Sequence, residues 1–149
     1  MTPKSKRTIL FTVLCLVAIG AGIGYYLYNK KPLNPNDVSP DTKTTSIELY
    51  QAFAADTVVA KKKFSRKDEV VEVSGIVLRI SQNQDKQTII LLKTNEAGAS
   101  VNCTMEGPVD NVKEADNINL KGFCTGMGAG DTDLGIVGDV YMIRCYKLK

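Results

Sequence analysis

The sequence predicts a mainly β domain with an N-terminal helix, carried behind a membrane-spanning segment. Residues 8–28 contain no charged side chain. From residue 69 onward, runs rich in β-branched residues alternate with polar turns, which is the pattern of short strands. Between these regions, apolar residues return at helical spacing over about 46–64. A chain of 149 residues suits one such domain with an accessory segment.

The N-terminal segment is expected to anchor the protein in a membrane. Residues 1–7 carry Lys4, Lys6 and Arg7 and are expected to stay in the cytoplasm, following the positive-inside rule. Residues 8–28 would form the transmembrane helix, because about 20 apolar residues cross a hydrocarbon core of about 30 Å. The protein is therefore expected to be a single-pass membrane protein with its C-terminal domain outside the cytoplasm, on the periplasmic side.

Two alternatives to an uncleaved anchor stay open. A cleaved signal peptide also has a basic start and an apolar core, and residues 18–20, Ala-Ile-Gly, could serve as a cleavage site. A lipoprotein would need a small residue before its acceptor cysteine, and Cys15 follows Leu14, which fits poorly. Either alternative would still export the domain.

A linker and a helix are expected next. Residues 29–44 contain three prolines among polar residues, a composition that favours an extended linker. Thr45 and Glu48 have the spacing of a capping box, so we expect a helix from about Ser46 to Phe64. Its apolar stripe would pack on the following strands.

Five strands are expected after the helix, at residues 69–80, 87–94, 99–105, 118–124 and 140–148, with a short helix around 109–115. Gly75 lies inside the first strand, where glycine commonly marks a bend that lets one strand serve both sides of a small barrel. A bent first strand and an insertion between the third and fourth are typical of a five-stranded OB-type barrel. The domain of helix plus OB barrel would span residues 45–149.

Several segments are shared with one known family: Leu49-Tyr50-Gln51-Ala52-Phe53, Val71-Glu72-Val73-Ser74-Gly75-Ile76-Val77, Val101-Asn102-Cys103-Thr104, Lys121-Gly122-Phe123-Cys124-Thr125-Gly126 and Cys145. Through them the chain resembles the bacterial tRNA-anti-like OB-fold proteins, which are small exported or lipoprotein-like domains. The resemblance implies the OB fold, and its label implies nucleic-acid binding by analogy with anticodon-binding domains. The glycine-rich loop between the last two strands is longer than is usual in that family.

The charge distribution does not favour nucleic acid as the partner. From Asp68 to the end of the chain there are 12 acidic and 8 basic residues, whereas nucleic-acid affinity comes largely from Lys and Arg. One basic cluster stands before this region. It is either a solvated helix C-terminus or a docking patch for phosphate, lipid headgroups or an acidic partner. Its members are Lys61, Lys62, Lys63, Arg66 and Lys67.

Three cysteines, Cys103, Cys124 and Cys145, fall in the expected strands, and alternation places each on an apolar face. They are either buried thiols, or contribute one disulfide, or include a reactive thiol; for a disulfide, Cys124 with Cys145 is the first guess because these two lie on consecutive strands. A zinc site would need a fourth ligand and closer spacing.

No enzymatic activity, metal or cofactor is expected. The chain has no histidine, which removes the commonest general base and the usual partner of a nucleophile. The loop of residues 126–135 contains Asp131 and Asp133, which resemble the start of a calcium loop, but the later ligands are absent. A glycine-rich hairpin loop is the preferred interpretation.

The function expected from the sequence is that of a membrane-anchored, extracytoplasmic OB-fold binding or interaction module. OB domains bind ligands on the face of their second and third strands. On that face we expect Thr88, Ile90, Lys93, Thr94 and Asn102 to contact the ligand. Aromatic residues for base stacking are scarce, so an envelope protein, a peptide or a glycan is the favoured partner. The alternative is a nucleic-acid-binding OB protein.

Overall fold

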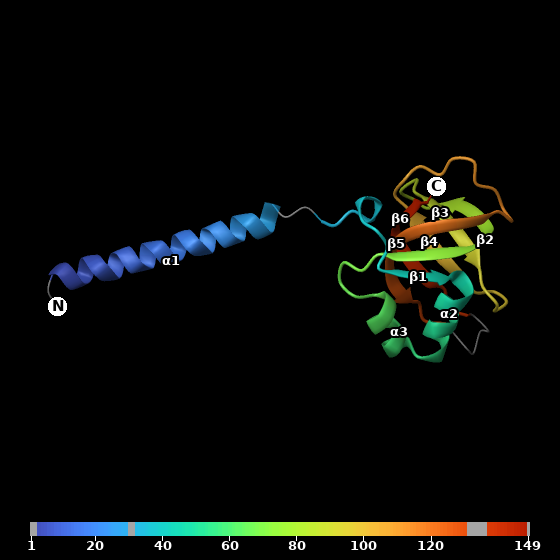
Figure 1. Ribbon diagram of the computed structural model, residues 1–149, viewed down its shortest axis with the longest axis horizontal. Coiled ribbons are helices and arrows are strands. Elements are labelled where there is room, and N and C mark those ends of the chain that lie inside the picture. The colour runs from blue at the N-terminus through green and yellow to red at the C-terminus, as the bar shows by residue number, and fades with distance from the viewer. Residues whose placement is uncertain (1–2, 30–31, 131–136, 149) are drawn as a thin grey trace. The chain divides into compact units, whose positions relative to one another are not determined.

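The computed structural model describes residues 3–29, 32–130 and 137–148. By its internal contacts the chain divides into two units, residues 1–33 and 34–149. Among its described residues, the first unit contains one helix, α1 (Pro3–Asn29). The second unit, called the barrel unit below, holds the strands of the described residues and the helices α2 and α3 (Figure 1).

Helix α1 agrees with the helix expected over residues 8–28. Its segment Phe11–Asn29 is 19 residues long and has a mean hydropathy of 1.8. The segment is long and apolar enough to cross a membrane, by its length and composition alone.

The barrel unit contains a closed barrel of five strands, as the sequence predicts. The strands are β2 (Val71–Gln82), β3 (Thr88–Lys93), β4 (Ser100–Met105), β5 (Asn117–Met127) and β6 (Val140–Lys147). They pair in the order β2-β3-β4-β6-β5, and β5 returns to pair with β2. Every pair is antiparallel except β4–β6, which gives the layout of an OB fold.

Strand β2 closes the barrel because it changes partner along its length. Residues 71–76 pair with β5, and residues 77–82 pair with β3. The change occurs next to Gly75, as the sequence predicts, and the pairing with β3 skips Leu78, which forms a bulge. One long strand therefore contributes to both sides of the barrel.

A sixth strand was not predicted. β1 (Thr42–Thr45) pairs in parallel with residues 71–74 of β2. Before it comes the 3-10 helix η1 (Pro35–Asp37), whose Pro35 is buried. The Nζ of Lys121 donates hydrogen bonds to the carbonyls of Asn36 and Val38, at 2.9 and 3.0 Å. Most of the segment expected to be a linker, residues 29–44, therefore belongs to the barrel unit.

The helix expected over Ser46–Phe64 is two helices, α2 (Ser46–Ala55) and α3 (Thr57–Phe64). The capping box of Thr45 and Glu48 forms as predicted. Asp56 ends α2 with an extended backbone and caps α3, because its Oδ1 accepts from the amides of Val58 and Val59 at 2.8 and 3.0 Å. Both helices lie at one end of the barrel (Figure 1). They cover its core with side chains that include Leu49, Phe53, Ala60 and Phe64.

The short helix expected around residues 109–115 does not form. Asn111 and Ala115 have φ angles of 55° and 69°, in the left-handed region, which interrupts any right-handed helix. Val109 and Val112 instead pack against the barrel core from this loop.

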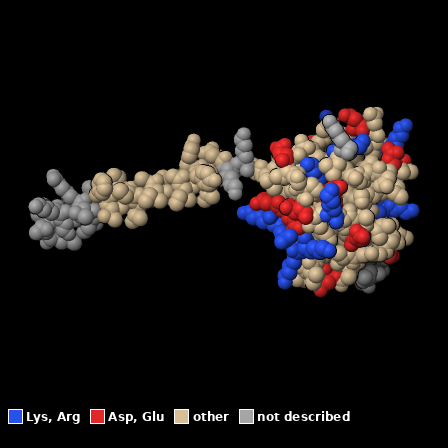
Figure 2. Space-filling model, viewed as in Figure 1, with Lys and Arg blue, Asp and Glu red and all other residues tan. Residues whose placement is uncertain are grey.

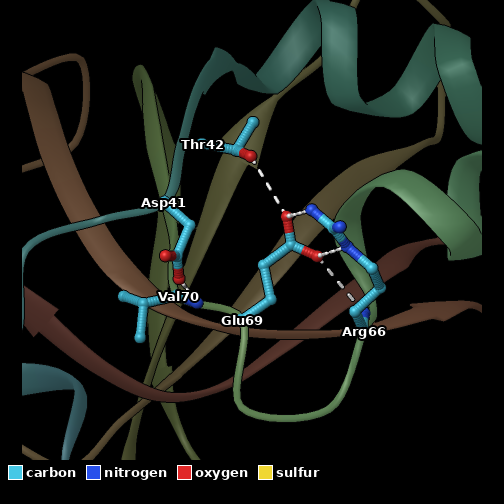
Figure 3. Close-up of polar contacts among 5 residues, drawn as sticks. All are labelled: Asp41, Thr42, Arg66, Glu69 and Val70. Carbon is cyan, nitrogen blue, oxygen red and sulfur yellow. Dashed lines mark hydrogen bonds and ion pairs between the residues drawn. The ribbon is translucent and has the colours of Figure 1, made fainter.

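A buried carboxylate holds the starts of β1 and β2 together (Figure 3). Glu69 is 5 % exposed and accepts hydrogen bonds from the Nε and Nη2 of Arg66, at 2.9 and 3.1 Å, and from the Oγ1 of Thr42, at 3.1 Å. Beside it, the Oδ2 of Asp41 accepts from the amide of Val70 at 2.9 Å. The hydrogen bonds from Arg66 hold the pKa of the Glu69 carboxyl below its ordinary value of 4.5.

We expect Glu69→Gln to lower the free energy of unfolding by about 1–3 kcal/mol, because it leaves Arg66 and Thr42 without their charged acceptor. Since the pKa of Glu69 is lowered by folding, its stabilisation is present above the unfolded pKa and is lost as the pH falls through the folded pKa. The stability difference between wild type and variant should therefore shrink as the pH falls below about 4.5. Urea titration followed by near-ultraviolet circular dichroism measures it.

The matched control is Glu72→Gln. Its partner Lys43 lies 3.0 Å away but is 73 % exposed, so the loss should stay below about 1 kcal/mol. Equal losses in the two variants would show that Glu69 contributes no more than a surface ion pair does.

Candidate binding face

The outer face of β2, β3, β4 and β6 carries a continuous row of side chains. Cross-strand register places Arg79 opposite Leu91, Leu91 opposite Asn102, and Asn102 opposite Tyr141. Paired residues project to the same side of a sheet, and the alternate residues of these strands fill the barrel core. We call this surface the outer face and include in it the neighbouring Leu78, Ile89, Thr104 and Ile143.

Large apolar side chains are exposed on the outer face. Leu78 is 49 % exposed, Tyr141 42 % and Ile143 41 %. Leu78 projects outward next to Arg79 because it is the bulge residue of β2. On β6, Arg144 has a φ of 52°, and the register with β4 shifts between Met142 and Cys145. Two backbone irregularities therefore shape this face.

A hollow of about 360 Å³ lies at one edge of the outer face. The carboxylate of Asp139, which precedes β6, accepts a hydrogen bond from the amide of Ser100 at 2.7 Å and so joins two walls of the hollow. Apolar and polar groups both line it: Leu78, Arg79, Leu91, Gly98, Ala99, Ser100 and Asp139. Such a mixture suits a side chain or small group that is held partly by apolar contact.

The charges of the outer face do not form a basic groove. The Nε of Arg144 lies 2.7 Å from the Oε2 of Glu106, and its guanidinium stands 5.9 Å from the ring centre of Phe123. Because of the hydrogen bond to Glu106, the pKa of Arg144 is raised above its ordinary value. Arg79 forms no ion pair within the described part of the chain, and it is the cation best placed to meet a ligand.

The five residues predicted to contact the ligand do not share one face. Ile90 is fully buried and points into the barrel. Thr94 is 5 % exposed, and its Oγ1 donates to the carbonyl of Ala99 at 2.8 Å. Neither can contact a ligand on the outer face. Lys93 is exposed, while Thr88 and Asn102 are half-buried, so contact by these three stays a prediction.

The residues predicted from the sequence mix the two phases of the alternation: Lys93 and Asn102 are on the outward phase, but Thr88 and Ile90 are on the inward phase of β3. In β3, Ile90 and Leu92 point inward, which turns Ile89 and Leu91 outward. All four are large aliphatic residues, so hydrophobicity alone gives no signal for the phase. The bulge that exposes Leu78 has no sequence signal beyond the nearby Gly75.

The three cysteines of the barrel are buried free thiols. Cys103 and Cys145 are fully buried and their side chains are in hydrogen-bond contact. Cys124 stands opposite Met142 in the β5–β6 pairing. The pair favoured from the sequence, Cys124 with Cys145, is therefore not bonded in the structure. The hydrogen bond to Cys145, together with burial, raises the pKa of the Cys103 thiol well above its ordinary value, and burial raises that of Cys124.

Among the described residues no group of three His, Cys, Asp or Glu side chains is placed to hold a metal ion. Asp131 and Asp133, the residues compared with a calcium loop, lie outside the described residues.

We expect the barrel thiols to be alkylated by iodoacetamide on the order of a hundredfold more slowly in the folded protein than in urea, because burial shields all three from the reagent and the raised pKa values of Cys103 and Cys124 lower their thiolate content. Peptide mass spectrometry of the Cys15→Ser protein measures each site separately. Rates in the folded protein that equal those in urea would contradict the buried placement.

The comparisons with known proteins agree with the fold. No curated protein matches the chain. A family model described as tRNA_anti-like matches residues 1–134, which include α1 and run through the end of β5. The match covers most of the chain, and the barrel has the strand order of an OB fold. The protein therefore belongs to the tRNA_anti-like family.

Proposed function

We propose that this protein is a membrane-anchored binding module that holds a protein or peptide segment on the outer face of its OB barrel. The observation that carries the proposal is the group of exposed apolar side chains on that face, Leu78, Tyr141 and Ile143. Exposed apolar groups clustered on a soluble unit commonly mark interaction sites. Tyrosine and arginine are also enriched in interface hot spots, and Tyr141 and Arg79 both belong to the cross-strand row of this face.

The anchor in this proposal is α1, with the barrel unit outside the cytoplasm. The length and hydropathy of Phe11–Asn29 support a membrane span. Lys4, Lys6 and Arg7 precede the span and support a cytoplasmic N-terminus.

The module is proposed to act by binding and not by catalysis. The sequence supplies no histidine, and the three barrel thiols are buried, two of them with raised pKa values. Of the buried or half-buried carboxylates, Glu69 is held by Arg66 and Asp139 by the amide of Ser100. These groups support a structural role for the ionisable side chains of the barrel.

A nucleic acid is the second candidate ligand. The family name refers to anticodon-binding domains, and Tyr141 and Arg79 lie in the same cross-strand row, where they could stack on a base and meet a phosphate. Against it stand the 12 acidic and 8 basic residues from Asp68 onward. Single-strand binding requires a positively charged groove.

We expect the full chain in lipid nanodiscs to select extended peptides with apolar side chains from a random phage-displayed library. Leu91→Glu should weaken binding of a selected peptide at least about tenfold, because it places a charge at the centre of the apolar face. Isothermal titration calorimetry measures the change. The control Ile47→Glu adds the same charge to α2, at a residue that is 43 % exposed and lies outside the strands of the outer face, and should leave affinity unchanged. Equal loss in both variants would place the binding site elsewhere.

We also expect no binding of single-stranded DNA or RNA to the same nanodiscs at about 0.15 M salt, where charge attraction is screened beyond about 8 Å. Fluorescence anisotropy of labelled oligonucleotides measures it. Binding that persists at this salt and is lost in Tyr141→Ser would support the nucleic-acid function over the peptide function. A panel of soluble glycans in the same assay tests a glycan as the ligand.

A further inference from the structure

The outward surface of α3 combines exposed valines with a row of lysines. Val58 and Val59 are 63 % and 61 % exposed, and the lysines that follow them are exposed as well, while Ala60 and Phe64 are buried against the barrel. Residues four apart lie on the same side of a helix, so Val58 neighbours Lys62 and Val59 neighbours Lys63. We call Val58, Val59, Lys61, Lys62, Lys63 and Lys67 the α3 surface.

The lysines of the α3 surface have no carboxylate partner among the described residues, in contrast to the neighbouring cations. Lys43 pairs with Glu72, and Arg66 pairs with Glu69. Figure 2 shows Lys and Arg side chains gathered over the part of the barrel unit where Figure 1 places α3. The patch is locally positive on a barrel that has an acidic surplus from Asp68 onward.

Stabilisation of the helix explains only part of this arrangement. Lysines in the last turn interact favourably with the helix dipole and cover apolar surface, as Lys63 does where its Nζ stands 4.9 Å from the ring centre of Phe64. The dipole gives no reason for two exposed valines beside them. Apolar residues that project beside lysines are the pattern of helices that lie in the interface of an anionic membrane.

The tether to α1 is short. Helix α1 ends at Asn29 and the barrel unit begins at Asn34. Since a residue spans at most about 3.6 Å, the intervening chain reaches no further than about 18 Å. A short tether raises the effective concentration of the barrel unit at the membrane surface, so even a weak attraction suffices for docking.

We propose that the α3 surface docks on anionic phospholipid headgroups of the membrane that holds α1. This inference rests on the membrane anchor of the proposed function. The lysines supply the attraction to lipid phosphates, and Val58 and Val59 enter the headgroup region. Because α2 and α3 cover one end of the barrel, docking through α3 leaves the outer face of the strands open to its partner.

The sequence contains no tryptophan, so a single introduced tryptophan can report on docking by its fluorescence. Val59→Trp in the full chain gives a single reporter, and the protein is placed in nanodiscs of phosphatidylcholine with or without phosphatidylglycerol. We expect tryptophan emission to shift to shorter wavelength, and brominated lipid to quench it, only where phosphatidylglycerol is present. Both effects should disappear at about 1 M salt, where the Debye length falls to about 3 Å.

Charge variants show whether docking comes from attraction between the lysines and the lipid headgroups or from the preference of the introduced tryptophan for the membrane interface. In the Val59→Trp background, Lys62→Gln with Lys63→Gln should weaken docking about 25-fold, about fivefold for each lysine. The matched control, Lys86→Gln with Lys113→Gln, removes the same charge from exposed residues outside the α3 surface and should have no effect.

The outcomes distinguish this inference from the anchor. A chain that fails to elute with the nanodiscs overturns both the anchor and the docking. A chain that elutes with them but shows the same emission with both lipids, or the same quenching in both double variants, overturns the docking and leaves the anchor standing.

Discussion

The barrel depends on the way β2 is shared among three neighbouring strands. Its first half is paired with β5 and lies along β1, while its second half is paired with β3. A strand can change partner in this way only where it bends. At the bend, a Cβ added to Gly75 would lie 2.6 Å from the Oγ of Ser46 and 3.3 Å from the Cβ of Leu92. Only a residue without a side chain fits between the start of α2 and the end of β3.

The same bend positions the rest of the barrel unit. The Oγ of Ser46 donates to the carbonyl of Lys93 at 2.6 Å, which fixes the start of α2 against the end of β3. The helices therefore cover one end of the barrel and leave the outer face of the strands uncovered. Next to the bend, the bulge turns Leu78 outward beside Arg79 and gives the outer face its apolar character. One constraint on β2 thus connects closure of the barrel with the surface that we propose binds the partner.

The barrel could be predicted from the sequence because its signals are local: the alternation of apolar residues, the turn residues and Gly75. The capping box at Thr45 is a local signal of the same kind. Strand β1 was not predicted, because a four-residue strand of Thr and Lys gains its order only from pairing with β2. The break between α2 and α3 at Asp56 was also not predicted. An aspartate within a helical pattern can either stay in the helix or cap the start of a new one, and its residue type alone does not distinguish the two cases. The residues predicted for the outer face mix the two phases of β3, because Ile89 and Ile90 have the same side chain and only packing in the barrel shows which of them points inward.

A double-mutant cycle on Gly75 and Ser46 tests the account of β2 most directly. Gly75→Ala should lower the free energy of unfolding by about 1–3 kcal/mol, because the added methyl meets Ser46 in a packed core. In a Ser46→Gly background the same change should cost clearly less, which gives a coupling of at least about 0.5 kcal/mol. If Gly75→Ala does not change stability, or if it costs the same in both backgrounds, contact with α2 does not require glycine at the bend of β2. Either result would contradict the proposed constraint on β2.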